Sequence, residues 1–509
     1  MALAKDKLAE SLKELRKLQK KNKSVVFRPG ELTRTHRERL QKEGYVQQVM
    51  QGWYISDSPD KQPGESTSWY ISYWDFCSQY LKERFSNKWI LSPEQSLSII
   101  SGNWTVPNQL IIRSSKGQNN VTSLLFDASI VDLKQDLPKA SQISVLKGIR
   151  HLALPYALIN CTHRFFESNP TDARTALFMI RDVSDILGPL LDGGHSVIAG
   201  KLAGAFRNVG KKLFAEEIIR TFKSAGYAIR ETDPFMEKLP TIEIISPGSP
   251  YVPRINLMWQ EMRDQVISVF PNAPGIPGNI IAYLEQVDEV YQTDAYNSLS
   301  IEGYQVTKEL INRVKSGNWD PEYHQGDQRK IDALAARGYW QAFQSVKKSL
   351  KKILTGNRPG KVFENDFRDW YRELFQPMVT AGLIEQSDLA GYRNQPVFIR
   401  NSRHVPLSSD AVRDAMPAML ELMKKEDNPA VMAVLGHFVF VYIHPYRDGN
   451  GRIARFLMNS MLASGGYPWT VIPLEKRKEY MDSLEEASIN QNIKPFAEFI
   501  AGLVLNRMK

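Results

Sequence analysis

The sequence predicts a mainly α-helical protein built from more than one domain. Its 509 residues are too many for one ordinary hydrophobic core. Apolar residues recur at helical spacing over residues 5–23, across most of 140–232 and over 453–463, and residues 431–443 form an apolar run. Alternating apolar and polar residues, which are typical of strands, are concentrated in short runs between residues 44 and 135. We therefore expect small sheets in the first third of the chain and helices elsewhere.

The first sixty residues predict two helices followed by a hairpin. Four leucines at helical spacing define the first helix, over residues 5–23, and a short helix follows over 33–43. Residues 44–49 and 51–55 read as two strands with a turn between them. This order is that of a winged helix-turn-helix, and it resembles the start of antitoxin-like proteins and transcriptional regulators. We assign residues 1–60 to such a module.

DNA is a candidate partner of this module. Four basic residues would lie on the presumed recognition helix, namely Arg34, His36, Arg37 and Arg39. The formal net charge of +9 also favours nucleic acid, although it is spread over a long chain. A solvated basic face, or a surface that docks on protein, explains the same pattern equally well. DNA binding and these alternatives both stay open.

The middle of the chain predicts an α+β extension and a helical connecting region. Short strand-like runs over residues 90–135 suggest a small sheet, so we assign residues 61–135 to an extension of the first module. Residues 136–250 are mostly helical by period. Turn-rich segments at 246–250 and 271–278 indicate boundaries, and the last domain is expected over residues 255–509.

Composition predicts a cytoplasmic protein with no membrane partner. The first residues soon become charged and lack the apolar core of a signal peptide. No run approaches the roughly 18 apolar residues of a membrane span. Cys77 and Cys161 are the only cysteines, which makes a disulfide framework unexpected and suits a reducing compartment.

The most informative segment is residues 444–455, which reads His-Pro-Tyr-Arg-Asp-Gly-Asn-Gly-Arg-Ile-Ala-Arg. Apolar runs at 431–443 and 453–463 predict a helix on each side, with the loop opening the second helix. The start of a helix exposes unpaired N–H groups and binds anions. Gly449 and Gly451 allow the backbone to turn these amides inward and leave room for a phosphate.

The side chains of this loop suit phosphoryl chemistry. Arg452 and Arg455 lie one turn apart on the same helix, so both guanidinium groups can face one polyphosphate. Asp448 offers a hard oxygen ligand for Mg²⁺. His444 suits the removal of a proton from an attacking hydroxyl. Asn450 either fixes the turn or donates to a phosphate. No cysteine or serine is placed as a covalent nucleophile, so direct in-line transfer of a nucleotide group is expected.

These residues resemble the signature of the Fic (filamentation induced by cAMP) family, His-Pro-Phe-x-Asp/Glu-Gly-Asn-Gly-Arg-x-x-Arg. Only the third position departs, because Tyr446 replaces phenylalanine. The exchange keeps the aromatic ring and adds a hydroxyl that needs a partner or water. A pattern with this many fixed positions is specific, and the alternative is a solvated polar loop between two helices.

The resemblance implies an activity and a role for each residue of the motif. Fic enzymes transfer AMP from ATP to a Ser, Thr or Tyr hydroxyl of a protein. By the same resemblance His444 is the base, and Asp448 holds Mg²⁺. The remaining motif residues would bind the nucleotide, with the α- and β-phosphates held by Gly449, Asn450, Gly451 and Arg452 and the γ-phosphate by Arg455.

Two upstream segments resemble further parts of such a domain. Residues 397–399 and 405–406 read as short extended runs around a polar turn, similar to the β-hairpin flap that aligns a target by strand addition. The rest of the domain is expected to be helical. Ser298 to Gly303 fit the inhibitory pattern Ser/Thr-x-x-x-Glu-Gly/Asn, on a helix around residues 294–303. The resemblance implies that Glu302 pairs with Arg455 and blocks the γ-phosphate. An ordinary helix end at Gly303 is the alternative.

Two other features are interpreted as structural. The glycines of residues 194–211 lack the spacing of a P-loop. His437 lies in an apolar helical run and is expected to be a packed core histidine.

The function predicted from these observations is that of a self-inhibited bacterial protein adenylyltransferase that also modifies itself. One alternative is a Fic enzyme that transfers UMP or GMP, or removes AMP. Another is a nucleotide-sensing, DNA-binding transcriptional regulator, and a third is a toxin–antitoxin fusion. A kinase of the Doc type is disfavoured because its motif loses the Gly-Arg end that is kept here. A homodimer is also considered.

Overall fold

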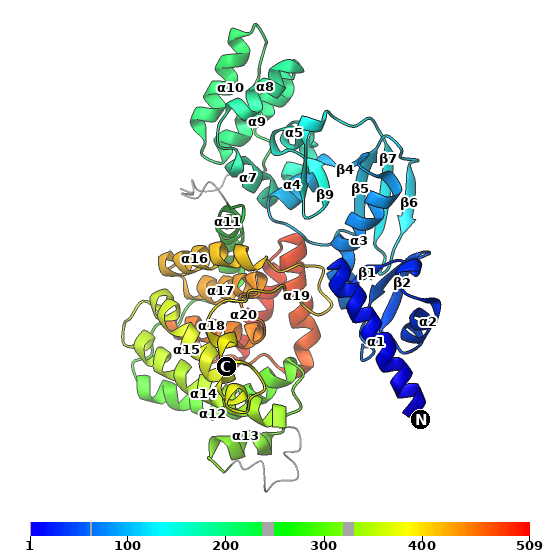
Figure 1. Ribbon diagram of the computed structural model, residues 1–509. Coiled ribbons are helices and arrows are strands. Elements are labelled where there is room, and N and C mark those ends of the chain that lie inside the picture. Colours follow the sequence, from blue (N-terminus) through cyan, green and yellow to red (C-terminus); the bar gives the residue numbers. More distant parts are fainter. Residues whose placement is uncertain (1, 62–63, 237–248, 319–329, 509) are drawn as a thin grey trace. The chain divides into compact units, whose positions relative to one another are not determined.

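Helices make up most of the chain, and the sheets that accompany them are short (Figure 1). The computed structural model describes residues 2–61, 64–236, 249–318 and 330–508. The chain divides into two units. The first comprises Met1–Pro250 with Phe398–Val405, and the second comprises Tyr251–Val397 with Pro406–Lys509. The predicted mainly α-helical class is confirmed. The predicted division into four parts stays a prediction, and part of its 246–250 linker lies outside the described residues.

The first unit begins with the predicted pair of helices and a small sheet. These elements are α1 (Ala2–Asn22), β1 (Val26–Phe27), α2 (Arg34–Lys42), β2 (Val46–Met50) and β3 (Trp53–Ser56). The strands form an antiparallel sheet in the order β1-β3-β2. Thr33 caps α2 by accepting the His36 N–H. Leu15 and Leu18 of α1 pack with Leu40 of α2 in one small core. The resemblance to a winged helix stays a prediction.

Basic side chains of α2 make contacts inside this module. The His36 ring lies 2.9 Å from Ser11 Oγ on α1, and Arg39 donates to the same oxygen at 2.7 Å. The Arg37 guanidinium lies over the Tyr54 ring, with 5.2 Å to its centroid. Three of the four residues proposed to read DNA are therefore engaged within the module. DNA binding through α2 remains a prediction that these contacts do not favour.

The rest of the first unit contains the predicted small sheet and then helices. The sheet has the order β4-β5-β7-β6, with β5 and β7 parallel. Its elements and their neighbours are α3 (Thr67–Phe85), β4 (Trp89–Leu91), α4 (Pro93–Ile100), β5 (Gln109–Ser114), β6 (Asn120–Ser123) and β7 (Ser129–Lys134). A hairpin and six helices follow: β8 (Ile143–Leu146), β9 (Ile149–Leu152), α5 (Leu154–Asn160), α6 (His163–Ser168), α7 (Pro170–Met179), α8 (Ser184–Asp192), α9 (Ser196–Asn208) and α10 (Lys212–Ser224).

Gly204 in α9 has a packing role, in agreement with the absence of a P-loop spacing in residues 194–211. A Cβ atom on Gly204 would lie 2.2 Å from the main-chain oxygen of Thr232. This glycine therefore permits close packing of the backbone inside a helix and does not open a phosphate loop.

The second unit consists of helices and connecting loops, with no strand among its described residues. Its main helices are α11 (Tyr251–Val269), α12 (Ile280–Ile301), α13 (Lys308–Lys315), α14 (Lys330–Leu354), α15 (Pro359–Thr380), α16 (Ser409–Lys425), α17 (Pro429–Ile443), α18 (Asn450–Ser464), α19 (Arg477–Asn490) and α20 (Lys494–Met508). Nearly every residue of α17 and α18 is buried, so this pair forms the centre of one large core. The turn-rich segment 271–278 joins α11 to α12 inside this unit.

The prediction of a β-hairpin flap at residues 397–406 is wrong. The segment contains no strand in the described chain, and its polar groups bond to other residues of the first unit. The Asn401 N–H donates to Thr67 Oγ1 and its side chain accepts the Ser66 N–H, both at 3.0 Å. The Val106 N–H donates to the main-chain oxygen of Arg403 at 2.9 Å. Backbone groups that these contacts satisfy have no need of a ladder within the segment.

Membrane-spanning helices are not found in the described residues, because no helix there combines the required length with sufficient apolarity. Both cysteines are buried free thiols.

Candidate active site

His444 stands at the junction between α17 and the loop that leads to α18. It ends α17 in the left-handed conformation, with φ 55° and ψ 61°. Its ring Nδ1 lies 3.1 Å from the main-chain oxygen of Val441. Since a carbonyl oxygen only accepts, this bond places the proton on Nδ1 and leaves Nε2 with a free lone pair.

The surroundings of His444 keep the ring neutral near pH 7. Burial lowers the pKa of His444 to about 4, and the charge of Arg393 acts in the same direction. The bond to Val441 opposes this shift in pKa but does not cancel it. A neutral imidazole with an unprotonated Nε2 is the form that can accept a proton.

The turn after His444 is closed by Asn450. Its Oδ1 accepts the Tyr446 N–H at 2.9 Å, and its Nδ2 donates to the Tyr446 main-chain oxygen at 2.8 Å. Of the two roles left open for Asn450, the structure therefore displays the one that fixes the turn. The Tyr446 ring stacks on Tyr371, with centroids 3.7 Å apart and planes within 7°. Gly449 has φ 81°, and a Cβ there would lie 2.7 Å from the ring of Phe375.

Arg452 is a fully buried cation whose donors are unsatisfied. Its guanidinium lies between the rings of Tyr304 and Phe375, with centroids 5.1 and 5.0 Å away. Nη2 lies 3.1 Å from Asp448 Oδ2, but within the described chain no acceptor is aligned for a hydrogen bond with Nε, Nη1 or Nη2. Burial is the largest influence on the pKa of Arg452 and would lower it, but the negative charge of Asp448 together with Tyr304 and Glu302 outweighs burial, and the pKa is raised. Open donors on a buried cation suit an anionic ligand.

Arg455 is held by the end of α12. Its Nε donates to Ser298 Oγ at 2.8 Å, and its Nη2 donates to the Ser298 main-chain oxygen at 3.1 Å. Nη2 also lies 2.6 Å from Glu302 Oε1 in an ion pair. Burial is the largest influence on the pKa of Arg455 and opposes the charged form, but the charge and hydrogen bond of Glu302, together with the nearby Tyr480 and Tyr339, outweigh burial and raise the pKa. The two motifs, far apart in sequence, thus meet at one guanidinium.

The Glu302 carboxylate also lies over the first turn of α18. A Cβ atom on Gly451 would be 2.4 Å from Glu302 Oε1 and 3.1 Å from Arg455 Nη1. Glu302 ends α12 as its C-cap, and Gly303 follows with φ 94°. The carboxylate therefore sits where the N–H groups of a helix start attract an anion.

The structure brings all the predicted site residues of the two motifs into one region of the second unit. Several neighbours were missed by sequence reasoning. They are Arg393, which bonds to the main chain at His444, and three rings, those of Tyr304, Tyr371 and Phe375. Only Tyr304 carried a local signal, because it directly follows the inhibitory motif. The others reach the loop through tertiary packing.

His437 is a core histidine, as expected. Its Nε2 lies 2.8 Å from the Tyr480 hydroxyl, and the side chain is fully buried. Burial lowers the pKa of His437 to about 3, with a further contribution from Arg455. It is therefore neutral and packed, and it does not take part in the loop.

Ligands for a metal are sparse in the site itself. In the described part of the chain no group of three or more His, Cys, Asp or Glu side chains is arranged around a common point. Asp448 is the carboxylate that points outward, with 57% of its side chain exposed. Asp448 thus offers one exposed carboxylate beside the start of α18, where the Glu302 carboxylate is already paired with Arg455.

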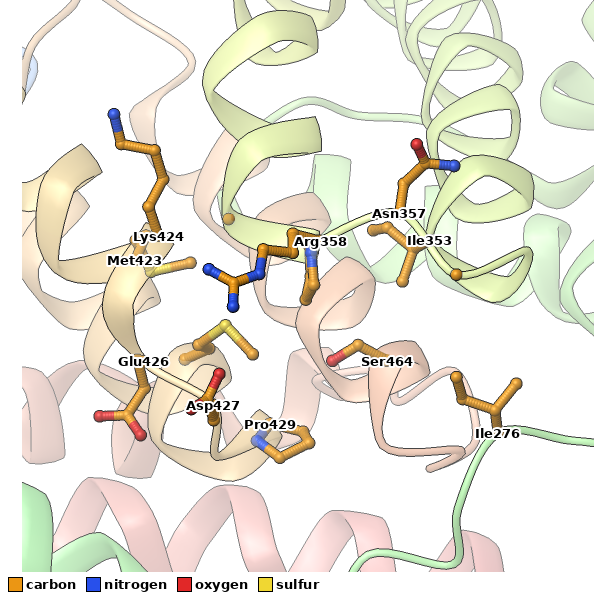
Figure 2. Close-up of a pocket in the computed structure, with 14 residues that line it drawn as sticks. Ile276, Ile353, Asn357, Arg358, Met423, Lys424, Glu426, Asp427, Pro429 and Ser464 are labelled. Atoms are coloured by element: carbon orange, nitrogen blue, oxygen red, sulfur yellow. The ribbon is translucent and has the colours of Figure 1, made fainter.

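A separate cavity of about 230 Å³ lies at the opposite ends of the two central helices (Figure 2). Its lining includes Pro429, which begins α17, and Ser464, which ends α18. Figure 2 shows Arg358 and Asp427 at its wall. None of the predicted site residues lines this cavity, so it is distinct from the motif region.

Comparison with known proteins identifies the domain that carries the loop. Residues 362–462 match the Fic/DOC family. A protein adenylyltransferase Fic of Nematostella vectensis is 26% identical over 254 residues, which cover 49% of this chain and 55% of that protein. Another, of Drosophila grimshawi, is 45% identical over 124 residues, which cover 24% of this chain and 25% of that protein.

Among solved structures, a fragment of Fic-1 from C. elegans matches with a TM-score of 0.38 and 16% identity, covering 70% of this chain and 89% of the fragment.

The chain spans about half the length of the Nematostella vectensis relative and about a quarter of the Drosophila grimshawi relative. The family match shows that this part of the chain is a Fic domain, which confirms the predicted resemblance.

Proposed function

We propose that the protein is an adenylyltransferase that transfers AMP from Mg·ATP to a Ser, Thr or Tyr hydroxyl of a target protein and of itself. We further propose that Glu302 restrains this reaction. One observation carries the proposal. The Glu302 carboxylate occupies the start of α18 and binds Arg455, where the phosphates of a nucleotide would otherwise lie. The names of the related adenylyltransferases support the same activity.

Phosphate binding would use the groups that face the start of α18. The N–H groups of its first turn and the open donors of Arg452 would hold the α- and β-phosphates. Gly449 and Gly451 keep that turn free of side chains, while Asn450 holds its shape. Arg455 would bind the γ-phosphate once Glu302 leaves it.

The proposed reaction is a direct displacement at the α-phosphorus. Nε2 of His444 takes the proton from the attacking hydroxyl, and the hydroxyl oxygen forms a bond to phosphorus. The bond from that phosphorus to the oxygen bridging to the β-phosphate breaks, and pyrophosphate leaves with the electron pair. The arginines stabilise the charge that develops on the phosphates. The products are the AMP-modified side chain and pyrophosphate.

Mg²⁺ fits the residues present. It binds proteins through one or two carboxylates and completes its shell with water and substrate phosphates, and Asp448 supplies one exposed carboxylate next to the proposed phosphate site. When bound, Mg²⁺ would neutralise charge on the phosphates.

Inhibition follows from competition for the same donors. A triphosphate and Glu302 cannot both accept from Arg455 Nη2, and the carboxylate also repels the anionic phosphates. Glu302 lies on the same chain, so the restraint needs no second protein. Release requires that the end of α12 move or that its carboxylate turn away.

The experiment that tests this function uses ATP labelled on either the α- or the γ-phosphate. Glu302→Gly protein should incorporate label from α-labelled ATP and none from γ-labelled ATP, and adding His444→Ala should abolish incorporation. Label from the γ-phosphate alone would mean a kinase. Label from UTP or GTP in place of ATP would change the donated group. No label from any nucleotide would move the function to that of a regulator.

The finer expectations about partners and compartment belong with this proposal. We retain the bacterial cytoplasm as the compartment, supported by two buried thiols that form no disulfide. DNA as a ligand of the N-terminal module and assembly into a homodimer remain predictions. The names of the relatives do not favour a purely regulatory protein.

A further inference from the structure

We propose that Arg393 is a positioning residue that ties the base His444 to both ends of the segment 396–406. This inference rests on the proposed function, because it assigns Arg393 a role in the same transfer reaction. Arg393 belongs to neither sequence motif, and it precedes His444 by about fifty residues.

The Arg393 side chain is 6% exposed and donates to three main-chain oxygens. Its Nε donates to the oxygen of His444 at 2.7 Å, and its Nη1 donates to that of Gln395 at 3.0 Å. Its Nη2 donates to the oxygen of Leu407. In addition, the Arg393 N–H donates to the oxygen of Pro445 at 3.0 Å. One residue thus joins three stretches of chain through four hydrogen bonds.

The contact at His444 bears on how the base is aimed. A non-glycine residue with φ 55° is uncommon, and it persists only when its surroundings hold it. Two bonds do so here. Val441 accepts from the ring, and Arg393 donates to the main-chain oxygen. Together they hold the ring of His444 and the peptide that follows it in one arrangement.

The contacts at Gln395 and Leu407 hold the chain on both sides of residues 396–406. That segment forms no hairpin, so no target-aligning role is assigned to it. Because one rigid guanidinium holds both flanks and the base, the distance from His444 to Gln395 and Leu407 is fixed. A base held in this way meets an attacking hydroxyl in a constant geometry.

A lysine at position 393 cannot make the same set of hydrogen bonds. The guanidinium presents planar donors in several directions, whereas an ammonium is a single point of charge on a flexible stem. Arg393→Lys therefore keeps the charge near His444 but loses the hydrogen bonds that join His444, Gln395 and Leu407. Arg393→Met keeps much of the volume but loses both the charge and these hydrogen bonds. Comparing the two variants separates the effect of the hydrogen bonds from that of the charge.

The charge has a signature of its own. Burial is the main cause of the low pKa of His444, and the Arg393 cation lowers it further, whereas the Val441 bond and the charges of Glu302 and Asp448 raise it. Every variant compared lacks Glu302, so the contribution of Glu302 is the same in all of them. Removing the cation should raise the pKa of His444. A base works when unprotonated, so the acidic limb of the rate profile should move to higher pH in Arg393→Met and stay in place in Arg393→Lys.

The experiment compares these variants in the Glu302→Gly protein. Initial rates of self-modification, ATP dissociation constants and rate–pH profiles are measured, with Arg413→Met as the control because Arg413 is an exposed arginine of α16 in the same unit. Both Arg393 variants should lower the maximal rate about tenfold or more, because small misplacements of reacting groups are costly. The ATP dissociation constant should change by less than about twofold, since Arg393 lies on no proposed phosphate contact.

Three results would overturn the proposal. They are a maximal rate within about twofold of the parent in Arg393→Met, full activity in Arg393→Lys, or an ATP dissociation constant that weakens in parallel with the rate. If the parent Glu302→Gly forms no AMP adduct, the proposed function itself fails. In that case backbone hydrogen exchange tests separately whether Arg393 holds these stretches of chain together. Faster exchange at both 395–407 and 441–446 in Arg393→Met supports it, and unchanged exchange at either stretch contradicts it.

Discussion

Removing the Glu302 carboxylate should strengthen ATP binding while it weakens the fold. In the structure this carboxylate accepts from Arg455 Nη2 at 2.6 Å and lies over the first turn of α18. Any triphosphate that uses Arg455 must first break that contact. Glu302→Ala removes the competitor and leaves Ser298 in place as a partner of Arg455.

The magnitude follows from the burial of the pair. Arg455 is 4% exposed and Glu302 is 25% exposed, so the ion pair is largely shielded from water. A hydrogen bond to a charged group contributes about 1.5–3 kcal/mol net. At about 1.4 kcal/mol per factor of ten, ATP should bind about 10- to 100-fold more tightly to Glu302→Ala. The free energy of unfolding without ATP should fall by about 1–3 kcal/mol, because a buried cation loses its carboxylate.

The assay is calorimetric titration with Mg·ATP. The parent and the Glu302→Ala variant both also carry His444→Ala, so that turnover does not consume ATP. Glu285→Ala is the matched control, because Glu285 is an exposed glutamate of the same helix α12. Thermal unfolding with and without Mg·ATP measures the loss of stability in Glu302→Ala and the gain in stability on ATP binding. The gain in melting temperature from ATP should be larger in Glu302→Ala than in the parent.

Equal or weaker ATP binding in Glu302→Ala would refute the reasoning. It would mean that Glu302 and the nucleotide do not compete for Arg455. The ion pair would then be a structural contact at the end of α12, as at an ordinary helix terminus.

Three further predictions follow from the contacts described. Burial lowers the pKa of His444 to about 4, and removing the Glu302 charge lowers it further, so self-modification by the uninhibited enzyme should be flat from about pH 6 to about pH 8. Buffered initial rates that fall on the acidic side near pH 6.5 would contradict this. Burial raises the pKa of Asp294 from 3.8 to about 6, so its folded form holds a proton that the unfolded chain releases, and stability is lost as pH rises through that range. In Asp294→Asn the amide oxygen can still accept from the Tyr339 hydroxyl. As the pH rises from about 4 to about 8, the free energy of unfolding of this variant, measured in urea, should increase relative to that of the parent by up to about 3 kcal/mol. A difference between the two proteins that does not change with pH would count against this prediction. Glu65 and Arg400 form an ion pair at 2.6 Å, so reversing the charge of either residue should speed hydrogen exchange over residues 398–405. Reversing both charges should bring the exchange rate back, with a coupling energy below about 1 kcal/mol because the arginine is exposed. An exchange rate that stays fast in the double variant would refute the pairing.

The loop and its two helices were readable from sequence because their signals are local. Apolar residues on all sides mark α17 and α18, and Gly449 marks the start of the second helix. The proximity of Glu302 to Arg455 was implied by a motif and not by periodicity, since the two residues lie about 150 positions apart. Resemblance supplied that tertiary contact.

What sequence reasoning missed depends on partners distant in the chain. Residues 397–399 and 405–406 read as short extended runs around a polar turn, but hydrogen bonds of this segment go to Ser66, Thr67 and Val106, which no local pattern reveals. The basic residues of α2 were expected to lie on a helix that contacts DNA. The inward contacts of His36 and Arg39 depend on where α1 packs. Arg393 gave no signal, because its acceptors are main-chain oxygens that any residue could supply.

The central claim is that the loop transfers AMP and that Glu302 restrains it. The most direct test is the intact mass of three proteins after incubation with Mg·ATP: the parent, Glu302→Gly, and Glu302→Gly with His444→Ala. We predict an increase of one or more AMP units on Glu302→Gly, with little on the parent and none on the double variant. An adduct of phosphate mass, an AMP adduct that survives His444→Ala, or an unmodified Glu302→Gly protein that nevertheless binds ATP would contradict it.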